Sequence, residues 1–283
     1  MEIGFYTPAY GVKEDCFGCA TFGHVGQWEP AEASFISLAS QVKGDVVCGT
    51  YEYCLENIPN KKYQAAIVLI GNAGRENWFV KALTAKIKVP VVGGGAAIHP
   101  ATGQTAMVTG NQQAAVYLIQ DDRYDFEVCC ENIHYMVLSE HKIGFSDPRQ
   151  MDTVDGMDAV TWLEQKKASL ELEDTDFEHL TFSDTNGINA HLSLVDGKIR
   201  SGRDLTQRMQ LRYVPASRVQ ERMHKFYDDQ DAVVFGCAGL KGILPEPLQT
   251  EGVGLFLFGE ICTKDGVSEF GNLMLSKLRI LPK

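Results

Sequence analysis

Residues 230–239 read Gln230-Asp231-Ala232-Val233-Val234-Phe235-Gly236-Cys237-Ala238-Gly239, an apolar run that stops at two glycines. A second run, Gly254-Leu255-Phe256-Leu257-Phe258-Gly259-Glu260-Ile261, ends in the same way, and a third extends from Leu273 to Leu281. Short apolar runs bounded by glycine are typical of β-strands buried on both faces. Glycine at a strand end lets the backbone turn sharply, because no Cβ forbids positive φ. Near these three runs stand the chemically capable side chains Cys237, Glu260 and Asn272.

The first half of the chain repeats the pattern. The segment Ala66-Ile67-Val68-Leu69-Ile70-Gly71-Asn72-Ala73-Gly74 matches residues 231–239, and Val91-Val92-Gly93-Gly94 corresponds to residues 257–260 at nearly the same distance downstream. Two copies of a strand followed by G-x-A-G predict an internal duplication, with the strand ends of both copies facing a shared cleft. The connections differ, because residues 77–88 are predicted to be a helix whereas two prolines interrupt residues 241–251.

We predict an α/β (α+β) protein of two halves, with mixed sheets flanked by helices, because strands arrive both in meanders and around single helices. The boundary is predicted near Cys130, which gives domains 1–130 and 131–283. Helices are predicted at residues 30–41, 77–88, 157–170 and 215–227. Strands are predicted at residues 46–48, 64–70, 90–92, 105–109, 114–119, 126–130, 134–138, 151–154, 191–195, 198–200 and 210–213, with a hairpin turn at Asp196-Gly197.

Composition excludes several classes of protein. The 283 residues are 45% apolar and 22% charged, which is ordinary for a globular protein, and the formal net charge is −11. This acidic balance disfavours a nucleic-acid or anionic-membrane partner, for which a basic face is expected. No apolar run reaches the roughly 20 residues that span a bilayer, so no membrane insertion is predicted. The N-terminus lacks the pattern of a secretory signal, and we therefore expect a cytoplasmic protein.

The eight cysteines allow four disulfides, but a cytoplasmic chain is expected to keep its thiols reduced. Cys16 and Cys19 form a C-x-x-C that suits either a metal or a redox pair, although no second such pair follows. No histidine follows Cys19 directly, which excludes covalent c-type haem attachment at this motif. Cys129 and Cys130 are adjacent in a predicted strand, where at least one is expected to be a small buried hydrophobe.

Several blocks of the chain resemble the FIST family of bacterial sensory proteins. They are V-V-F-G-C-A-G, L-F-L-F-G-E-I-C and E-F-G-N-L-M-L in the tail, preceded in the same order by V-P-V-V-G-G-G-A-A and R-Q-M-D-T-V-D-G-M-D-A-V. The resemblance covers roughly residues 60 to 283 and is most specific at Gly259-Glu260-Ile261 with Asn272. It implies FIST N-like and FIST C-like domains and an intracellular receptor for a small molecule, with amino acids as proposed ligands and haem in some relatives. It also implies a separate signalling output protein, because this chain carries no output domain.

Glu260 has three interpretations from sequence. It suits a structural carboxylate that accepts backbone N–H bonds, a ligand-binding group that holds an ammonium, or a general base with a raised pKa. Asn272 can donate and accept, and suits a carboxylate, an amide or a neighbouring loop. Cys237 suits a nucleophile only with a basic partner, for which His99 or His224 are the candidates, and its apolar neighbours favour an inert thiol.

Gly93-Gly94-Gly95 invites a phosphate-binding interpretation, but no third glycine follows in register and no Walker lysine is present. The FIST resemblance instead places this triple glycine in a ligand cleft, where bare N–H groups would bind a carboxylate. We therefore predict a small-molecule sensor rather than an enzyme. The alternatives are a hydrolase that uses Cys237 or Glu260 and a haem sensor with an axial histidine or cysteine; no resident cofactor and no metal site are predicted. The predicted ligand-binding residues are Asn72, Arg75, Gly93, Gly94, Gly95, Cys237, Gly259, Glu260 and Asn272.

Overall fold

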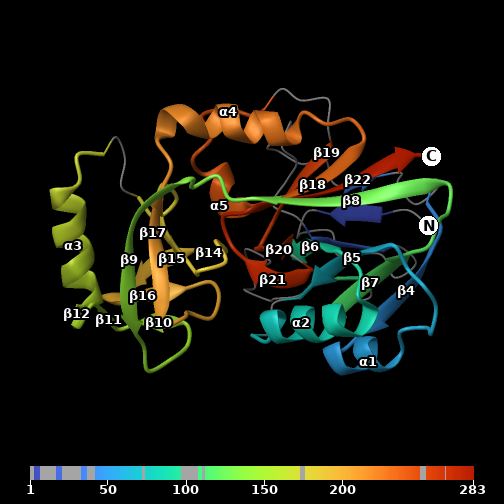
Figure 1. Cartoon of the computed structure of the whole chain (residues 1–283), viewed down its shortest axis with the longest axis horizontal. Coiled ribbons are helices and arrows are strands. Elements are labelled where there is room, and N and C mark those ends of the chain that lie inside the picture. Colours follow the sequence, from blue (N-terminus) through green and yellow to red (C-terminus); the bar gives the residue numbers. More distant parts are fainter. Residues whose placement is uncertain are drawn as a thin grey trace.

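The computed structural model describes residues 3–6, 17–20, 33–36, 42–71, 74–96, 108–109, 112–172, 176–248, 253–264 and 266–283. Two mixed sheets stack in the centre of the molecule, with helices on their outer faces (Figure 1). This mixed α/β architecture confirms the predicted fold class.

The first central sheet has six strands in the order β21-β20-β6-β5-β7-β4. Strand β5 lies near its centre, and all six of its residues are buried. Helices α1 and α2 cover one face of this sheet through apolar side chains that alternate along β5 with those of the opposite face. The elements are β4 (Gly44–Gly49), α1 (Tyr51–Glu56), β5 (Ala65–Ile70), α2 (Glu76–Ile87), β6 (Val91–Gly95), β7 (Ala114–Ile119), β20 (Glu260–Lys264) and β21 (Val267–Gly271).

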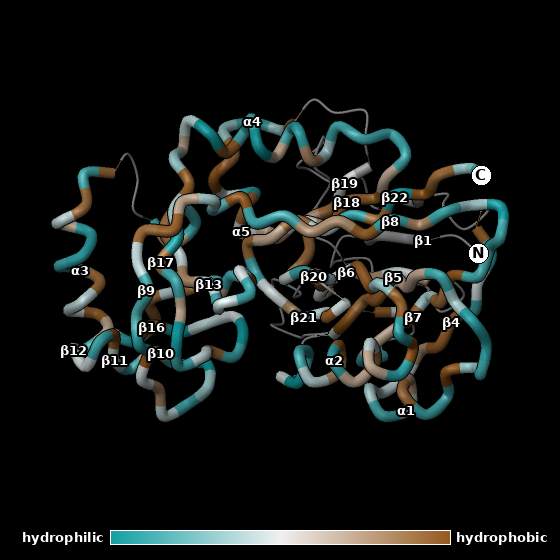
Figure 2. Tube along the Cα trace, in the orientation of Figure 1, coloured by the Kyte–Doolittle hydropathy of each residue, from teal (hydrophilic) through white to brown (hydrophobic). Residues whose placement is uncertain are grey.

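The second central sheet has four strands in the order β19-β18-β22-β8. One of its faces packs against the first sheet, and the other is covered by α4, which is largely hydrophilic on its outer side (Figure 2). The four layers are therefore α1 and α2, the first sheet, the second sheet, and α4. The elements are β8 (Tyr124–Glu131), α4 (Ala216–Tyr227), β18 (Ala232–Cys237), α5 (Ala238–Lys241), β19 (Val253–Leu257) and β22 (Leu275–Pro282).

The two sheets share one topology, as the predicted duplication requires. Strands β6-β5-β7-β4 correspond in order to β19-β18-β22-β8. In the first sheet β5 is parallel to β6 and antiparallel to β7, and in the second β18 is parallel to β19 and antiparallel to β22. The outermost strand is again antiparallel to its neighbour in both sheets. The predicted match between the first strands of the two copies is thus reproduced in space.

The second glycine match is wrong. Gly93 lies within β6, opposite Val68 in the middle of β5, whereas Gly259 follows the end of β19, whose last paired residue is Leu257. Equal spacing in sequence did not mean equal register, because α2 and the short α5 return the chain to its next strand at different heights.

Strands cross between the two halves of the chain. The boundary predicted near Cys130 falls at the end of β8, and β8 pairs with β22 at the far end of the sequence. Conversely, β20 and β21 extend the first sheet, because Glu260 of β20 pairs with Gly94 of β6. Each sheet is therefore completed by a strand from the other half.

Residues 132–215, between β8 and α4, form a separate layer at one end of the molecule, which we call the inserted segment (Figure 1). A six-stranded sheet in the order β12-β11-β9-β17-β13-β14 and a three-stranded sheet in the order β10-β16-β15 enclose their own apolar core with α3. The hairpin predicted at Asp196-Gly197 joins β15 to β16. The elements are β9 (Met136–Gly144), β10 (Gln150–Met151), β11 (Thr153–Val154), β12 (Met157–Asp158), α3 (Ala159–Ser169), β13 (Leu180–Ser183), β14 (Asn189–Ala190), β15 (Leu192–Val195), β16 (Lys198–Ser201) and β17 (Arg208–Tyr213).

The N-terminal region contributes a three-stranded sheet in the order β2-β1-β3, formed by β1 (Ile3–Tyr6), β2 (Phe17–Ala20) and β3 (Ala33–Ile36). The helix predicted at residues 30–41 is wrong where it is described, because β3 is a strand paired antiparallel with β1. A short apolar cluster does not separate helix from strand without its partner. Cys16 lies outside the described residues, and Cys19 is a buried free thiol.

No helix among the described residues is long and apolar enough to cross a membrane.

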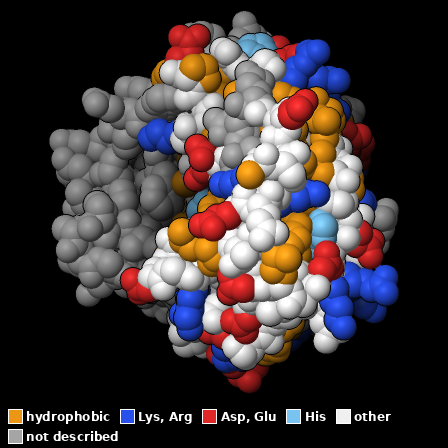
Figure 3. Space-filling view, turned by 90° about the vertical axis from the view of Figure 1, so that its left-hand side faces the viewer, with side chains coloured by type: hydrophobic (Ala, Val, Ile, Leu, Met, Phe, Trp, Pro, Cys, Tyr) orange, Lys and Arg blue, Asp and Glu red, His pale blue; other side chains and the backbone are white. Residues whose placement is uncertain are grey.

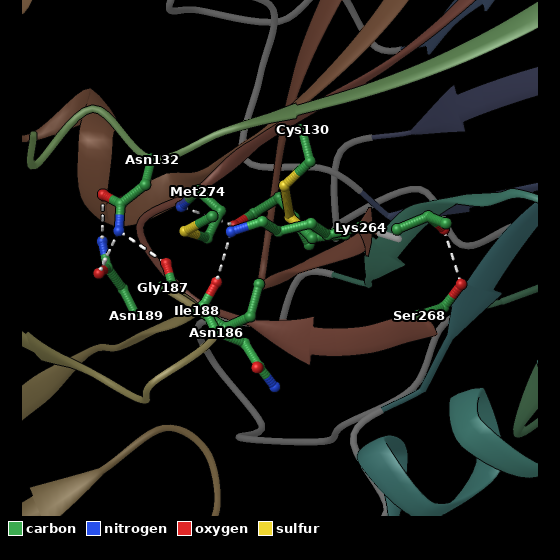
Figure 4. Close-up of a disulfide and its surroundings, with 12 residues drawn as sticks. Cys130, Asn132, Asn186, Gly187, Ile188, Asn189, Lys264, Ser268 and Met274 are labelled. Atoms are coloured by element: carbon green, nitrogen blue, oxygen red, sulfur yellow. Dashed lines mark hydrogen bonds between the residues drawn. A yellow bond between two sulfur atoms is a disulfide. The ribbon is translucent and has the colours of Figure 1, made fainter. Parts of the chain in front are cut away.

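A disulfide joins the two central sheets. Cys130 of β8 bonds to Cys262 of β20 across 132 residues of sequence, with their Cα atoms 5.4 Å apart (Figure 4). This pairing differs from the expectation of reduced thiols throughout the chain. It crosslinks the second sheet to the strand that carries Glu260.

We expect peptide mapping of the unreduced protein to recover one linked pair that contains Cys130 and Cys262. Cys262→Ser should lower the free energy of unfolding by about 2–4 kcal/mol, because the closed loop restricts the unfolded chain. Cys48→Ser, at a half-buried free thiol, is the matched control. Chemical denaturation with and without reductant measures the effect, and equal stability of wild type and Cys262→Ser without reductant would contradict it.

Candidate functional site

The ends of β18 and β20 bring Cys237 and Glu260 together. Cys237 is the last residue of β18 and pairs with Leu257 at the end of β19. Two residues later the chain crosses into the first sheet, where Glu260 opens β20 and pairs with both Gly94 and Gly271. Both side chains are buried, and that of Glu260 has no exposed surface. The site therefore lies where the two sheets meet.

The Glu260 carboxyl accepts fewer hydrogen bonds than its two oxygens could accept. Its Oε2 accepts the backbone N–H of Met274 at 3.3 Å, and no described residue hydrogen-bonds its Oε1. Burial raises the pKa of Glu260 well above its usual range, and the bonds from Met274 and Cys237 offset only part of this rise. Burial therefore favours the neutral, protonated form of the Glu260 carboxyl over the carboxylate.

Cys237 shares the same buried space. Burial, followed by the neighbouring Glu260, raises the pKa of the Cys237 thiol to about 12, against the opposing effect of backbone N–H groups of Leu273, Gly239 and Gly259. The thiol therefore stays protonated at neutral pH, which disfavours a nucleophile and agrees with the inert interpretation of its apolar surroundings.

Tyr227 completes a cluster of three buried ionisable groups. It comes from α4, and burial followed by Glu260 raises its pKa well above the usual range. A Cβ added at Gly236 would lie 2.2 Å from the Tyr227 hydroxyl oxygen, so the glycine makes room for the phenol. The sequence offered no signal for Tyr227 beyond its place on the apolar face of a helix.

Gly93, Gly94 and Gly95 are not an open loop, which corrects the sequence-based interpretation. They form β6, fully buried, and the Gly95 N–H donates to the Gly259 carbonyl at 3.0 Å. A Cβ at Gly94 or Gly95 would lie 2.2 Å from a backbone carbonyl of residues 258–259. Gly259 itself has φ +80, which L-residues rarely adopt. The glycines therefore serve close approach of two backbones.

Asn272 stands beside the cluster and ties it to the inserted segment. Its backbone N–H donates to the Asn189 carbonyl at 3.1 Å, and its Oδ1 accepts the His191 N–H at 3.4 Å. Asn189 is in turn bonded to Asn132 at 2.7 Å (Figure 4). Asn272 thus connects the end of β21 to the backbone of Asn189 and His191.

His191 lies close to Cys237, and sequence reasoning missed it. A Cβ added at Gly239 would lie 3.7 Å from Cδ2 of His191 and 3.8 Å from Sγ of Cys237, so ring and thiol flank this glycine. His99 lies outside the described residues, and His224 is in the last turn of α4. His191, which lies between β14 and β15 in the sequence, comes close to Gly239 only through the tertiary fold.

A cavity of about 440 Å³ opens on the other side of His191. His191 Nε2 lies 3.7 Å from Glu178 Oε1, and a hydrogen bond with His191 is the largest reason why the pKa of Glu178 is lowered. The cavity lies between α3 and β15, lined among others by Leu163, Lys167, Phe177, Glu178, His191 and Ser193. His191 is thus the residue that this cavity shares with the surroundings of Gly239.

The remaining predicted site residues do not join this cluster. Arg75 lies at the start of α2, where its guanidinium pairs with Glu52 at 2.8 Å and stacks over the Trp78 ring at 4.1 Å. Asn72 lies outside the described residues. No group of three or more His, Cys, Asp or Glu side chains in the described part of the chain is placed to hold a metal ion.

Ion pairs that sequence reasoning missed, of which those of Arg203 are buried, connect residues 149 and 203 to the elements of the first sheet and to Asp184. Arg149 pairs with Glu76 of α2 at 2.7 Å. Arg203 is almost fully buried and bridges Asp184 and Glu269, both at 3.1 Å. Such pairs are costly to break because either partner alone would be a buried charge.

No model of a known protein family matches the chain, and no curated protein matches it either. The resemblance to FIST domains therefore rests on the quoted motifs.

Glu260→Gln should change the pH dependence of stability. Because the pKa of Glu260 is higher in the folded state, wild-type stability falls as pH rises above about 5, by at most about 1.4 kcal/mol per pH unit. The variant lacks this ionisable group, so the difference obtained by subtracting the wild-type melting temperature from that of the variant should increase between about pH 5 and 8. Thermal melts across this range measure it.

Glu269→Gln is the matched control. Burial tends to raise the pKa of Glu269, but Lys81 and Arg203 lower it overall, so its ion pairs stabilise the fold at neutral pH. This variant should melt below the wild type. A constant difference between Glu260→Gln and wild type at every pH would show that Glu260 titrates normally.

Proposed function

We propose that this protein binds a small molecule at the Cys237–Glu260 cluster and acts as a sensor rather than an enzyme. One observation carries the proposal: Oε1 of Glu260 is completely buried and receives no hydrogen bond from any described residue. Leaving a buried polar atom unpaired costs about 1–3 kcal/mol. A ligand donor at this oxygen removes that cost, which favours binding.

The electrostatics favour an ammonium-bearing ligand, such as an amino acid. An adjacent cation favours the ionised carboxylate, so binding would release the proton that burial holds on Glu260. Affinity would then rise with pH, because less work is needed to remove this proton. The ligand charge offsets the desolvation that otherwise opposes a buried carboxylate.

The cavity beside α3 is the proposed route to the cluster. His191 lines this cavity and also lies against Gly239 next to Cys237, so a change in its ring position would open a path from the cavity toward the cluster. Asn272 holds the backbone of His191 and would sense such movement. The FIST resemblance supports the same class of function and a separate cytoplasmic output partner. In the cytoplasm, the Cys130–Cys262 pair would be exposed to reductant.

The alternatives receive less support. The raised pKa of Cys237 opposes a hydrolase that uses its thiolate. For a haem sensor, the buried His134 has Nε2 at 2.6 Å from the Glu178 carbonyl and Nδ1 at 3.0 Å from Asn189 Nδ2, so both ring nitrogens are engaged.

Amino acids supplied one at a time should reveal a ligand by thermal shift. Calorimetry should then show an affinity that increases by up to tenfold per pH unit between about pH 6 and 8. Glu260→Gln should weaken binding by about 1.5–3 kcal/mol, roughly tenfold to a hundredfold, and remove this pH dependence.

Arg75→Ala is the control, since its side chain contacts Glu52 and Trp78 and should leave affinity unchanged. An unchanged affinity in Glu260→Gln would exclude Glu260 as the binding group.

A further inference from the structure

Ser139, His141 and Asp155 form a continuous hydrogen-bonded series in the inserted segment. Ser139 Oγ lies 2.6 Å from His141 Nε2, and His141 Nδ1 lies 2.7 Å from Asp155 Oδ2. Strand β9 carries Ser139 and His141, and the turn between β11 and β12 carries Asp155; these elements lie with α3 at one end of the molecule (Figure 1). They share no residue with the Cys237–Glu260 cluster.

Local structure fixes each member. Ser139 and His141 are two residues apart on β9 and therefore project from the same face of the strand. Asp155 adopts φ +51 in the turn between β11 and β12, and its Oδ1 accepts the Lys142 N–H at 2.8 Å. The His141 ring is held edge-on against Trp162, with centroids 4.7 Å apart.

The hydrogen bonds also set the proton positions. The bond with His141, followed by the Lys142 N–H, lowers the pKa of Asp155, so this side chain is a carboxylate at neutral pH. A carboxylate at Nδ1 requires the proton on Nδ1, which leaves Nε2 as the acceptor of the Ser139 hydroxyl. A serine whose proton is accepted by an oriented imidazole is an activated nucleophile.

The strand edge beside Ser139 is open among the described residues. β9 pairs with β11 only at Ile143 and Gly144, so its earlier residues have no partner strand on that side. On the other side, the register with β17 skips Leu138, a β-bulge directly before the serine. A bulge leaves a residue out of the ladder and re-aims its neighbour, which here is Ser139.

The surroundings favour an apolar substrate. Met136 and Val137 on β9 are 37% and 50% exposed, and Met157 beside the Asp155 turn is 41% exposed. Figure 3 shows the face at this end of the molecule, where apolar side chains lie at the surface between charged ones.

We propose that Ser139, His141 and Asp155 form an esterase site for carboxylic esters with short apolar acyl chains. Ser139 Oγ attacks the ester carbonyl carbon while its proton moves to His141 Nε2. The C–O bond to the alcohol breaks, and the alcohol leaves with that proton. Water then attacks the acyl carbon while one of its protons moves to His141 Nε2. The bond between the acyl carbon and Ser139 Oγ breaks, His141 returns the proton to Oγ, and the carboxylic acid is released. Asp155 is a positioning residue that holds the imidazole.

Two probes test the proposal on the full chain: p-nitrophenyl butyrate hydrolysis and labelling by a fluorophosphonate, located by peptide mass spectrometry. The wild type should hydrolyse the ester and carry the label on Ser139. Ser139→Ala should lose at least about a hundredfold in rate, because it removes the nucleophile that forms the acyl-enzyme. Asp155→Asn should lower kcat tenfold or more while KM stays within about twofold, a split that a purely structural role would not produce.

Ser146→Ala is the matched control. Ser146 Oγ also bonds to a carboxylate, Asp152 at 2.7 Å, but no bond to a histidine accompanies it, and its loss should leave hydrolysis and labelling unchanged. Melting temperatures establish that each variant is folded. A wild type without label on Ser139 overturns the proposal, as does a folded Ser139→Ala that hydrolyses the ester at the wild-type rate. Such a result would assign the three side chains to bracing the sheet edge.

Discussion

Glu260 is buried because the backbone around it is paired on both sides. The chain leaves the second sheet after Leu257, crosses at Phe258-Gly259, and is at once paired with Gly94 of β6 and Gly271 of β21. The carboxyl cannot reach water without breaking β20 from its neighbours. Its desolvation is therefore enforced by strand pairing.

This crossing also explains the neighbouring residues. The crossing backbone at residues 258–259 lies so close to β6 that Gly94 and Gly95 have no room for a side chain, and Gly259 turns with a positive φ. Tyr227 and Cys237 fill the space beside the carboxyl without charge at neutral pH. The disulfide at Cys262, two residues along β20, holds the same strand to β8. Among the described residues, the groups that hold Glu260 in place do not pair it with a cation.

Sequence reasoning succeeded where the signal is local. The apolar run at residues 231–237, the helix near residues 77–88 and the Asp196-Gly197 hairpin were all predicted and found. It failed where the partner is distant in sequence. Residues 93–95 were predicted to be a loop because glycine has no side-chain pattern, but Gly94 and Gly95 belong to a strand that packs closely against residues 258–259.

The candidate sites show the same limit. Cys237, Glu260 and Asn272 were found from the ends of their strands, but Tyr227 and His191 approach only through tertiary packing. The strand predicted at residues 134–138 in fact starts at Met136 and continues to Gly144. Its extension places Ser139 and His141 on one face, an alternation that was visible in sequence once the strand was known to continue.

We expect the buried Glu260 carboxyl to be protonated at neutral pH and to ionise when a cationic ligand binds beside it. Infrared difference spectroscopy of wild type against Glu260→Gln at neutral pH tests this claim most directly, because a protonated carboxyl has a C=O band distinct from that of a carboxylate. The account predicts a protonated-acid band in the wild type that is missing in the variant. A difference spectrum that contains only ionised-carboxylate bands would contradict it.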